Sequence, residues 1–344
     1  MTVSQNVDDS SAVPPQVALL QMIIGSWVTQ ALYVAAKLGV ADLLSDGPKH
    51  CDRLAAATGS HSQSLYRVMR ALAGIGVFHE VGDRNFQLTP ISESLRTETP
   101  DSLRAWAMLV GESFHWNVWG ELGYSVKTGE PAWNKAHGMG PFEFFDRNPE
   151  AAQIFDTAMT NFSTPEIPAV MDAYDFAPYQ TVVDVAGNQG AFLAAILKAN
   201  PKAKGILFDL PPVIDRAHSF IKKEGLSDRC KLIGGDFFES VPAGGDLYIF
   251  KRIVHGWYDD GATKMLQHCH KAMNGSGKLL VIEMVMPPGN EPFFGKWLDL
   301  LMLLIAGMDR TEAEYRTLFN AAGFNLTRII PTQSPVSVIE GVPV

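Results

Sequence analysis

The sequence is poor in cysteine, and its cysteines are not arranged as in a disulfide framework or a structural zinc site. The 344 residues include three cysteines, Cys51, Cys230 and Cys269, and no CxxC pair. Disulfide scaffolds and zinc modules need cysteines in pairs or in clusters at short spacing. We therefore expect a protein of a reducing compartment, the cytoplasm.

A long apolar segment is also missing. The longest uninterrupted apolar run, residues 300–306, is far shorter than the ~20 residues that cross a bilayer as a helix. The first 15 residues are polar and lack the apolar core of a signal peptide. We expect no membrane partner, a flexible tail over residues 1–15 and a buried helix around residues 300–306.

Positive charge is scarce as well. The chain has 28 Lys and Arg against 37 Asp and Glu, a net charge of −9, whereas proteins that hold nucleic acid need a positive field. Neither the GxSxG motif of serine hydrolases nor the HExxH motif of zinc proteases occurs. These absences argue against nucleic acid as a partner and against two common classes of hydrolase.

The N-terminal third of the chain has the pattern of a helical module. Residues 17–44 carry apolar residues at helical spacing with a break near Gly39, which predicts a helix pair. Residues 52–90 then read as helix, turn, helix and two strands joined by a Gly-Asp turn, the order of a winged helix. Four arginines and three acidic residues between positions 51 and 90 give 4 − 3 = +1, which is little for phosphate binding. We therefore favour a structural or dimerisation module over a DNA-binding one.

Strand-like and helical runs alternate after about residue 175. Five runs rich in β-forming residues predict strands at 182–186, 205–209, 231–236, 246–252 and 278–285. Such alternation predicts an α/β domain with a mostly parallel sheet, covered by helices on both faces, whose ligands lie at the carboxyl ends of the strands. Functional residues should therefore follow the strands.

Carboxylates follow the first three predicted strands. Asp184 precedes a glycine-bearing turn that ends at Gly190, Asp209 comes 209 − 190 = 19 residues later, and Asp236 lies beside two phenylalanines. An acidic side chain at the second of these places can accept hydrogen bonds from ribose hydroxyls, and the third can recognise an adenine amine beside an aromatic ring. Three carboxylates around one crevice repel a pyrophosphate and suit a cationic ligand. S-adenosylmethionine has that charge.

A histidine follows the fourth predicted strand and a glutamate lies in the fifth. His255 can act as a general base in the crevice, although an isolated histidine of this kind more often caps a helix or packs in a core. Glu283 stands in the apolar run VIEMVM, where an unpaired carboxylate is costly, and it can hold His255 in one tautomer. The run His268-Cys269-His270 lies in a helical stretch whose adjacent side chains diverge, so we expect no metal site there.

Together these segments closely resemble the S-adenosylmethionine-dependent O-methyltransferases of the caffeate, flavonoid and acetylserotonin type, a family with many bacterial natural-product enzymes. The resemblance runs from about residue 20 to residue 341. The segments that carry it are NKAHGMGPFEFF (134–145), FDTAMTNFS (155–163), VVDVAGNQG, FDLPPVI, GDFF, KRIVHGWYDD, GKLLVIE and GMDRTEAEYRTLFNAAGF (307–324). It implies a homodimer in which a winged-helix dimerisation domain precedes a Rossmann-like class I methyltransferase domain.

The same resemblance implies the roles of individual residues. His255 becomes the base, flanked by Glu283 and Asp309. The implied cofactor contacts are Asp184, Gly187, Asn188, Gln189, Gly190, Asp209, Leu210, Asp236, Phe237, Lys251 and Trp257. The implied lining of the acceptor pocket, for which plain core packing is the alternative, is Phe155, Met159, Phe162, Trp297 and Met302.

Two positions depart from the family pattern. Asp309 stands where a glutamate usually precedes Arg-Thr, which shortens the carboxylate beside His255. The loop after the first strand reads Ala186-Gly187-Asn188-Gln189-Gly190 in place of GGGxG. Asparagine tolerates left-handed backbone angles, so the turn is expected to survive.

The sequence thus predicts a tail over residues 1–15, a dimerisation domain over residues 16–115 and an S-adenosylmethionine-binding catalytic domain over residues 116–344. The predicted activity is metal-free methyl transfer to a phenol or enol hydroxyl of a small aromatic natural product, with His255 as the base. One alternative keeps the fold and the cofactor but catalyses hydroxylation, decarboxylation or a pericyclic step. A less favoured alternative is a DNA-binding regulator.

Overall fold

The computed structural model describes residues 13–99, 101–273 and 275–344, so most of the tail predicted over residues 1–15 lies outside the described residues. The chain forms two compact units, which are described separately. Unit 1 comprises residues 1–116 and 150–161, and unit 2 comprises residues 117–149 and 162–344. Unit 1 thus includes a segment that follows the predicted domain boundary in the sequence.

Unit 1 begins with three helices over the predicted helix pair. They are α1 (Pro15–Ile23), α2 (Gly25–Lys37) and α3 (Val40–Leu43). Gly39 precedes α3 with a φ of 65°, a left-handed angle that glycine adopts without steric cost. The predicted break near Gly39 is therefore confirmed, and a further break at Ile24 separates α1 from α2.

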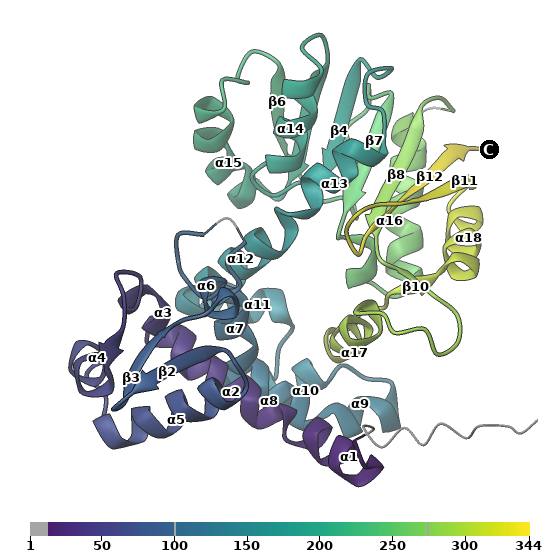
Figure 1. The fold of residues 1–344 in the computed structure, drawn as a ribbon. Helices are drawn as coiled ribbons and strands as arrows, with labels where there is room; N and C mark the ends of the chain where they lie inside the picture. Colours follow the sequence, from purple (N-terminus) through teal and green to yellow (C-terminus); the bar gives the residue numbers. More distant parts are fainter. Residues whose placement is uncertain (1–12, 100, 274) are drawn as a thin grey trace, which may run out of the picture. The chain divides into compact units, whose positions relative to one another are not determined.

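The predicted winged helix follows these helices (Figure 1). Its elements are β1 (Lys49–His50), α4 (Cys51–Thr58), α5 (Ser62–Gly74), β2 (Phe78–Gly82) and β3 (Asn85–Leu88). Asp83 and Arg84 turn the chain between β2 and β3 with φ angles of 45° and 60°, as a tight hairpin requires. α5 buries Leu65, Met69 and Leu72 against this sheet and its neighbours.

The remaining helices of unit 1 bring residues 150–161 into it. They are α6 (Pro90–Glu93), α7 (Arg104–Gly111), α8 (Ser113–Gly120) and α12 (Pro149–Ser163), the last two of which continue into unit 2. Ala105 and Leu109 of α7 pack against Ala158 of α12, beside the partly buried Phe155 and Met159. This apolar contact explains why the segment groups with the N-terminal helices.

The helical stretch Pro15–Lys37 leaves much of its apolar surface uncovered. Leu19, Met22 and Trp27 are 59%, 76% and 71% exposed. This 23-residue stretch contains an 18-residue window with a mean hydropathy of 1.5, so it has the length and composition to cross a membrane, and it is the one such helix among the residues described. Length and composition are weak evidence for a span, because an apolar helix that packs against another protein meets the same test.

Unit 2 is built on a seven-stranded sheet in the order β11-β12-β8-β7-β4-β5-β6. The strands are β4 (Thr181–Val185), β5 (Lys204–Asp209), β6 (Cys230–Gly234), β7 (Leu247–Lys251), β8 (Lys278–Glu283), β11 (Phe324–Pro331) and β12 (Ser337–Pro343). Strands β4 to β8 are parallel, whereas β12 and β11 are antiparallel to their neighbours. All five predicted strands are confirmed, and the last two were not predicted.

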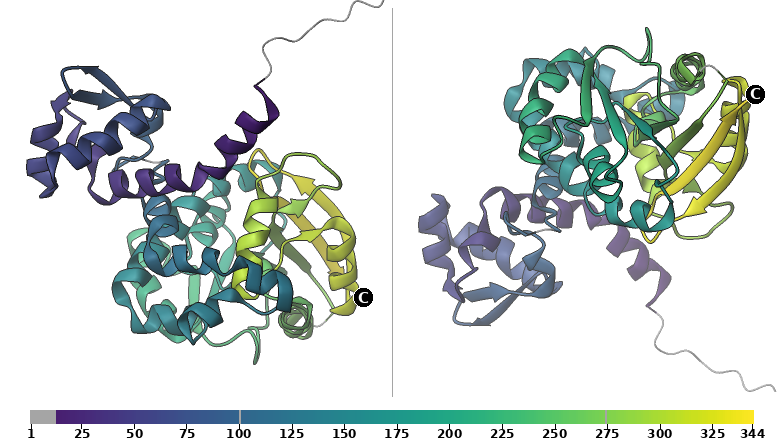
Figure 2. Two further views of the ribbon diagram at one scale, coloured as in Figure 1. Left: turned by 90° about the horizontal axis from the view of Figure 1, so that it is seen from below. Right: turned by 90° about the horizontal axis from the view of Figure 1, so that it is seen from above.

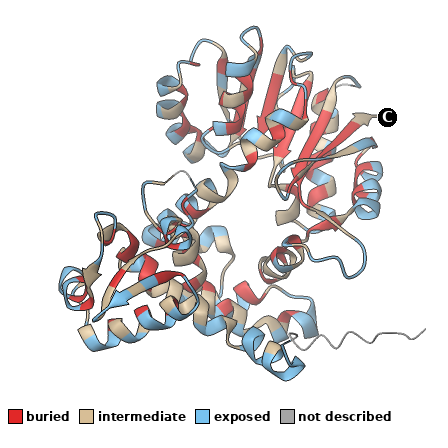
Figure 3. Ribbon diagram, in the orientation of Figure 1, coloured by how far each residue is buried: buried red, intermediate tan, exposed pale blue. Residues whose placement is uncertain are grey.

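Helices cover both faces of this sheet (Figures 1 and 2). Alternate strand residues point to opposite faces, so Val182 of β4 joins one apolar core and Val183 the other. The first core also takes α13 (Glu166–Ala173), α14 (Ala191–Ala199), α15 (Pro211–Lys223) and α17 (Gly295–Ile305), and the second takes α16 (Asp259–Met273) and α18 (Glu312–Ala321). The central strands are buried on both sides (Figure 3), which confirms the predicted α/β fold.

Short elements complete unit 2. They are α9 (Leu122–Thr128), α10 (Ala132–His137), α11 (Pro141–Arg147), the 3-10 turn η1 (Val254–Gly256) and the two parallel two-residue strands β9 (Val285–Met286) and β10 (Arg310–Thr311). Helices α9 and α10 contact α17. The predicted helix around residues 300–306 is confirmed as α17, which ends at Ile305.

The strand order places a reversal between β4 and β7. From β4 the chain moves outward to β5 and β6 and then returns to β7 on the other side of β4. In such sheets the loops that follow the two central strands diverge and leave a crevice at the carboxyl ends. The loop 186–190 after β4 and the loop 252–258 after β7 therefore frame the place where a ligand is expected.

Candidate active site

His255, Glu283 and Asp309 come together from three separate elements of unit 2. His255 lies in η1 after β7, Glu283 is the last residue of β8, and Asp309 directly precedes β10. The Nδ1 atom of His255 lies 3.3 Å from Oδ1 of Asp309 and 3.7 Å from Oε2 of Glu283. The other oxygen of Glu283, Oε1, accepts the backbone N–H of His255 at 3.3 Å. Both carboxylates therefore face the same ring nitrogen.

This arrangement has a chemical consequence for the imidazole. Carboxylates that face Nδ1 favour the tautomer in which Nδ1 carries the proton, and the lone pair then lies on Nε2. The His255 side chain is 12% exposed, whereas those of Glu283 and Asp309 are fully covered. The group that can exchange a proton with a ligand is thus the imidazole, and the carboxylates stand behind it.

Basic neighbours oppose the effect of burial on the Glu283 carboxyl. Burial raises the pKa of Glu283, and His255 and Arg252 act in the opposite direction. Nη1 of Arg252 lies 3.7 Å from Oε2 of Glu283, and its guanidinium covers the Phe162 ring at 5.3 Å. Arg252 has a φ of 60°, a costly left-handed angle for a residue with a long side chain. With this backbone angle the guanidinium lies beside Glu283, whose own apolar run, VIEMVM, contains no basic residue.

Several polar atoms in this cluster lack hydrogen bonds. Nδ1 of His255, Oε2 of Glu283, both carboxylate oxygens of Asp309 and the hydroxyl of Tyr315 have no hydrogen-bond partner among the described residues. Buried polar atoms without partners are rare in folded proteins and often mark a functional site. One imidazole nitrogen and two carboxylate oxygens within 4.8 Å of one another are also a donor set that divalent metals accept. The absence of a metal remains a prediction.

The loop after β4 has an unusual backbone. Ala186, Asn188 and Gly190 have φ angles of 56°, 53° and 87°, so the asparagine occupies the left-handed region as expected. Gly187 is required for a different reason: a Cβ there would lie 2.5 Å from the carboxylate of Asp184 and 2.6 Å from Leu207. Asn188 and Gln189 are exposed. The loop therefore presents its backbone and two amide side chains at the end of β4.

Asp184 and Asp209 lie beside this loop and differ in their hydrogen bonds. Asp184 is buried, and its Oδ2 has no hydrogen-bond partner among the described residues. Burial raises its pKa to about 7, with Lys251 lowering and Asp209 raising it. Asp209 accepts the backbone N–H groups of Asn188 and Leu210 at 2.8 and 2.7 Å, which leaves further lone pairs for a ligand. An unpartnered buried carboxylate and an acceptor beside a tight turn fit a cationic nucleoside such as S-adenosylmethionine.

Aromatic rings surround the third carboxylate. Asp236 follows β6 and accepts the N–H of Phe238 at 2.7 Å. The rings of Phe237 and Phe238 lie 4.7 Å apart between centroids, and Trp257 lies edge-on to Phe238 at the same distance. The structure thus brings Asp236, Phe237 and Trp257 together at the carboxyl end of the sheet. Leu210, another predicted cofactor contact, is 51% exposed.

Lys251, predicted as a cofactor contact, is engaged within the protein. Its Nζ donates to Oε2 of Glu166 at 2.7 Å and to the backbone and side chain of Ser163. Both charged groups of the Lys251–Glu166 pair are more than nine-tenths buried. Its ammonium therefore ties the start of α13 to the end of β7.

The predicted acceptor residues fall in both units. Phe155 and Met159 pack in unit 1, whereas Phe162, Trp297 and Met302 belong to unit 2. Within unit 2, Phe162 lies 6.0 Å from Phe294 and beneath Arg252, and Met302 is buried in the core under the sheet. Trp297 is 69% exposed. The acceptor role of these five residues remains a prediction.

Sequence reasoning missed three residues that support the site, Arg252, Asp299 and Arg310. Arg310 is fully buried and binds Asp259, the first residue of α16. Asp299 of α17 accepts the backbone N–H of Asp309 at 2.8 Å. Nothing in the sequence around Arg252 or Asp299 indicates that their partners are Glu283 and the backbone of Asp309.

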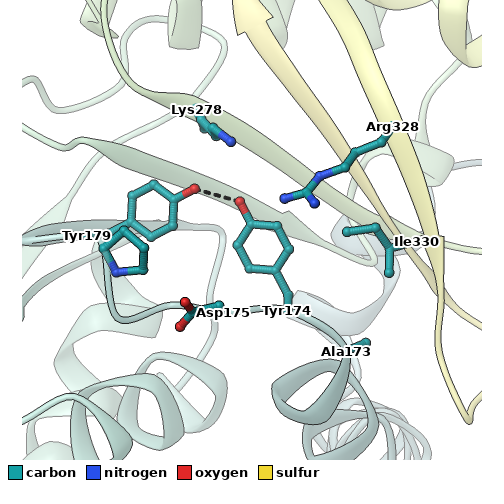
Figure 4. Close-up of a pocket in the computed structure, with 8 residues that line it drawn as sticks. Ala173, Tyr174, Asp175, Tyr179, Lys278, Arg328 and Ile330 are labelled. Carbon is teal, nitrogen blue, oxygen red and sulfur yellow. Dashed lines mark hydrogen bonds between the residues drawn. The ribbon is translucent and has the colours of Figure 1, made fainter.

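A cavity of about 470 Å³ lies elsewhere in unit 2 (Figure 4). Its wall includes Tyr174, Tyr179, Lys278 and Arg328, and Lys278 begins β8, so the cavity is at the opposite end of that strand from Glu283. The two tyrosine hydroxyls are 2.6 Å apart, and Tyr174, Lys278 and Arg328 all donate to the buried Glu340. These polar side chains bind one another, which is the pattern of a structural network.

Comparison with known proteins places both halves of the chain in one family. A family model described as an O-methyltransferase domain matches residues 119–325, and a second, described as an O-methyltransferase dimerisation domain, matches residues 20–98. The chain is 46% identical over 336 residues to a phenazine O-methyltransferase of Lysobacter antibioticus, covering 97% of this chain and 98% of that protein. It is 35% identical over 327 residues to the 8-amino-8-demethylriboflavin N,N-dimethyltransferase of Streptomyces davaonensis, covering 94% of each.

A solved structure supports the same assignment and the cofactor. The O-methyltransferase from neocarzinostatin biosynthesis, in complex with S-adenosylmethionine and 2-hydroxy-5-methyl naphthoic acid, has a TM-score of 0.82 and 32% identity, covering 92% of this chain and 96% of that one. The resemblance read from the sequence is thereby confirmed. The chain therefore belongs to the O-methyltransferase family with an N-terminal dimerisation domain, and it is an S-adenosylmethionine-dependent methyltransferase of natural-product biosynthesis.

Proposed function

We propose that this methyltransferase acts on the hydroxyl group of a small aromatic natural product, a phenol or an enol, and that His255 is its general base. The observation that carries this proposal is the position of Nδ1 of His255, 3.3 Å from one buried carboxylate and 3.7 Å from another. An N–H at Nδ1 leaves Nε2 free to accept a proton. Aromatic acceptors are supported by the relatives, one of which is named for phenazine and another of which binds a naphthoic acid.

The proposed step assigns each residue a defined task. Nε2 of His255 takes the proton of the acceptor hydroxyl, and the resulting oxygen anion attacks a methyl carbon, forming a C–O bond while a C–S bond breaks. S-adenosylmethionine supplies that methyl group as an electrophile and leaves as S-adenosylhomocysteine. Glu283 and Asp309 stabilise the imidazolium, which later releases its proton to water. The protein's further contribution is to align the two reactants and exclude water, which is worth several orders of magnitude in rate.

The cofactor role of the predicted contacts is part of the same proposal. We assign the backbone of residues 187–190 to the amino-acid end of S-adenosylmethionine, Asp209 to the ribose hydroxyls, and Asp236 with Phe237 to the adenine. Asp184, with its unpartnered Oδ2, contributes negative charge beside the cationic end. Leu210, Lys251 and Trp257 are assigned to the rim of this site, with Lys251 acting through its backbone.

We further propose a cytoplasmic homodimer formed by the N-terminal domain over residues 16–115, with the catalytic domain over residues 116–344. The support is the match to a dimerisation domain and the exposed apolar surface of α1 and α2. The three cysteines are free and buried, as suits a reducing compartment. Arg84 of the winged helix is engaged by Asp52 and the Tyr66 ring, which favours a structural module over DNA binding.

The test is a comparison of His255→Ala with the wild type on a panel of hydroxyphenazines and hydroxynaphthoates. We expect at least a ~100-fold loss of turnover with little change in S-adenosylhomocysteine affinity, because removal of a general base typically costs this much. Thr317→Ala on the outer face of α18, whose hydroxyl binds only the backbone of its own helix, is the control. Undiminished turnover in His255→Ala would show that another group removes the proton.

The nature of the product separates the remaining alternatives. Mass spectrometry of the reaction with a hydroxylated acceptor should show the gain of one methylene unit and an equivalent of S-adenosylhomocysteine. Methylation of the amino analogue in place of the hydroxyl compound would assign N-methylation, as in the riboflavin-type relative. An altered but unmethylated product would assign a different reaction to the same fold.

A further inference from the structure

Arg310 is the largest fully buried side chain among the described residues, with 0% exposure. It lies in β10, directly after Asp309 and before α18. A buried guanidinium is costly unless each of its donors is bonded. The partners of Arg310 therefore show which parts of the fold this residue holds together.

Those partners come from the two segments that carry the catalytic cluster. Nη1 donates to the carbonyl of Val254 at 3.3 Å and Nη2 to that of Trp257 at 2.9 Å, on either side of His255. Nε and Nη2 both donate to Oδ1 of Asp259, at 3.0 and 2.8 Å. Nη1 also reaches the carbonyl of Met308, the residue before Asp309, at 3.2 Å. One planar group thus bonds η1 and the segment that presents Asp309.

A second contact joins the same two segments of the chain. The N–H of Met308 donates to the carbonyl of His255 at 2.8 Å. Gly307 makes this approach feasible, since a Cβ at that position would lie 2.3 Å from the His255 carbonyl oxygen. The backbone of Gly307 and Met308 is therefore packed directly on η1.

The catalytic groups need this external support. η1 is a single turn of three residues, and such 3-10 turns have weak internal hydrogen bonds. The Asp309 carboxylate has no hydrogen bond of its own among the described residues, so its position is set by its backbone. That backbone is held by Asp299 through the Asp309 N–H and by Arg310. The guanidinium adds to these contacts the only side-chain group described that bonds both segments, and so helps to hold the imidazole and the Asp309 carboxylate at their separation of 3.3 Å.

We propose that Arg310 is a positioning residue for the reaction, because its guanidinium fixes the His255 turn against the Asp309 segment. This inference rests on the proposed role of His255 as general base. Arg310 does not touch the ring or the carboxylate and acts through their backbones. A lysine at this position keeps the charge but cannot bond three carbonyls and a carboxylate through one planar fork.

The first experiment compares Arg310→Lys with Arg316→Lys in steady-state methyl transfer. We expect kcat to fall about 10-fold or more in Arg310→Lys, because a displacement of about 1 Å in an active site is enough for such a loss. The KM of the acceptor and the affinity for S-adenosylhomocysteine should stay within about twofold. Arg316, on α18 and paired with the exposed Glu312, is the matched control and should leave kcat unchanged.

A double-mutant comparison distinguishes positioning from a general structural role. In the His255→Ala background, Arg310→Lys should cause no further loss, because both changes act on the same proton transfer. A structural role would lower kcat by the same factor in both backgrounds, and that result would overturn the proposal. If His255→Ala itself keeps wild-type turnover, the proposed function fails; if His255→Ala is inactive but Arg310→Lys is unaffected, the positioning role alone fails.

Asp259→Asn provides the decisive variant if Arg310→Lys does not fold. The Asp259 side chain is 70% exposed, so its replacement by an amide leaves the core intact while removing the charged partner of the guanidinium. We expect a smaller fall in kcat, about threefold to 10-fold, again without a change in S-adenosylhomocysteine affinity. An Asp259→Asn enzyme with wild-type kcat would refute the inference.

Discussion

Glu340 offers a test of the network beside the cavity in Figure 4. Its buried carboxylate accepts hydrogen bonds from Tyr174 at 2.7 Å, Lys278 at 2.9 Å, Arg328 at 3.0 Å and Thr327 at 2.8 Å. The residue lies on β12, paired with Leu280 of β8. Replacing Glu340 by Gln keeps the shape of the side chain and removes the charge on which two cations converge.

The expected cost follows from how exposed those cations are. Removing one partner of a fully buried ion pair costs about 3–5 kcal/mol. The Lys278 and Arg328 side chains are 35% and 55% exposed, so water replaces part of the lost interaction, and the Gln amide oxygen still accepts one hydrogen bond. We therefore expect the free energy of unfolding to fall by about 2 kcal/mol at neutral pH.

The pH dependence gives the same prediction a second readout. Burial raises the pKa of Glu340, but hydrogen bonds from Arg328, Tyr174 and Lys278 outweigh this effect and lower the pKa from 4.5 to about 2. A folded-state pKa below the unfolded-state value stabilises the fold above about pH 4.5, and this contribution is lost as the pH falls toward 2. Glu340→Gln should therefore lose more stability at neutral pH than at about pH 3.

The assay is urea unfolding followed by tryptophan fluorescence at several pH values. Glu312→Gln, which removes an exposed pair with Arg316, is the control and should change stability by less than about 0.5 kcal/mol. A constant difference between wild type and Glu340→Gln from neutral pH to about pH 3 would refute the reasoning, because the carboxylate charge would then not be the source of the stability.

Three further predictions concern the cofactor loop and the dimer. Gly187→Ala should weaken S-adenosylhomocysteine binding at least ~10-fold in calorimetry, since the new methyl group overlaps the Asp184 carboxylate. Gly123→Ala is the control and should not weaken binding, because a Cβ at Gly123 has no atom within 4 Å. Affinity for S-adenosylmethionine should increase as the pH rises through about 7, the pKa to which burial raises Asp184, and Asp184→Asn should remove this dependence. Met22→Asp, at a side chain that is 76% exposed on α1, should shift the protein from dimer to monomer in sedimentation velocity, whereas Val344→Asp, equally exposed at 80%, should not.

The parallel part of the fold was predictable because its signals are local. Each of the five predicted strands is a short run of β-forming residues. The observed strands begin and end within two residues of the predicted limits. β11 and β12 escaped prediction. β11 carries polar residues and alternates in burial, and β12 follows a turn without a Gly-Asn or Gly-Asp signal. The pairing of β12 with β8 is a long-range contact that no local sequence pattern indicates, and β11 joins the sheet through β12.

Residues of the candidate site were predictable where a polar or charged side chain stands in an apolar segment. Glu283 attracted attention because a carboxylate in an apolar strand needs a partner, and the structure supplies His255 and Arg252. The pairing of the Lys251 ammonium with Glu166 of α13 was not predicted, because Glu166 lies 85 residues earlier in the chain, and the cofactor contact of Lys251 stays a prediction. Arg310 entered the sequence analysis only as part of the family's Arg-Thr pair, and its contacts were not predicted, because they are to carbonyl groups of the turn after β7, which look the same in any sequence.

Hydrogen bonding differs between the residues that we assign to the reaction and two buried charged residues that support the fold. Arg310 and Glu340 are buried, charged and bonded several times, as expected of groups that stabilise a single arrangement. His255, Glu283, Asp309 and the Oδ2 of Asp184 retain free hydrogen-bonding capacity in the described part of the chain, although burial makes that costly. We expect a proton or a cationic ligand to recover this cost at the carboxyl ends of β4, β7 and β8, where the fully bonded Arg310 joins the His255 turn to the Asp309 segment.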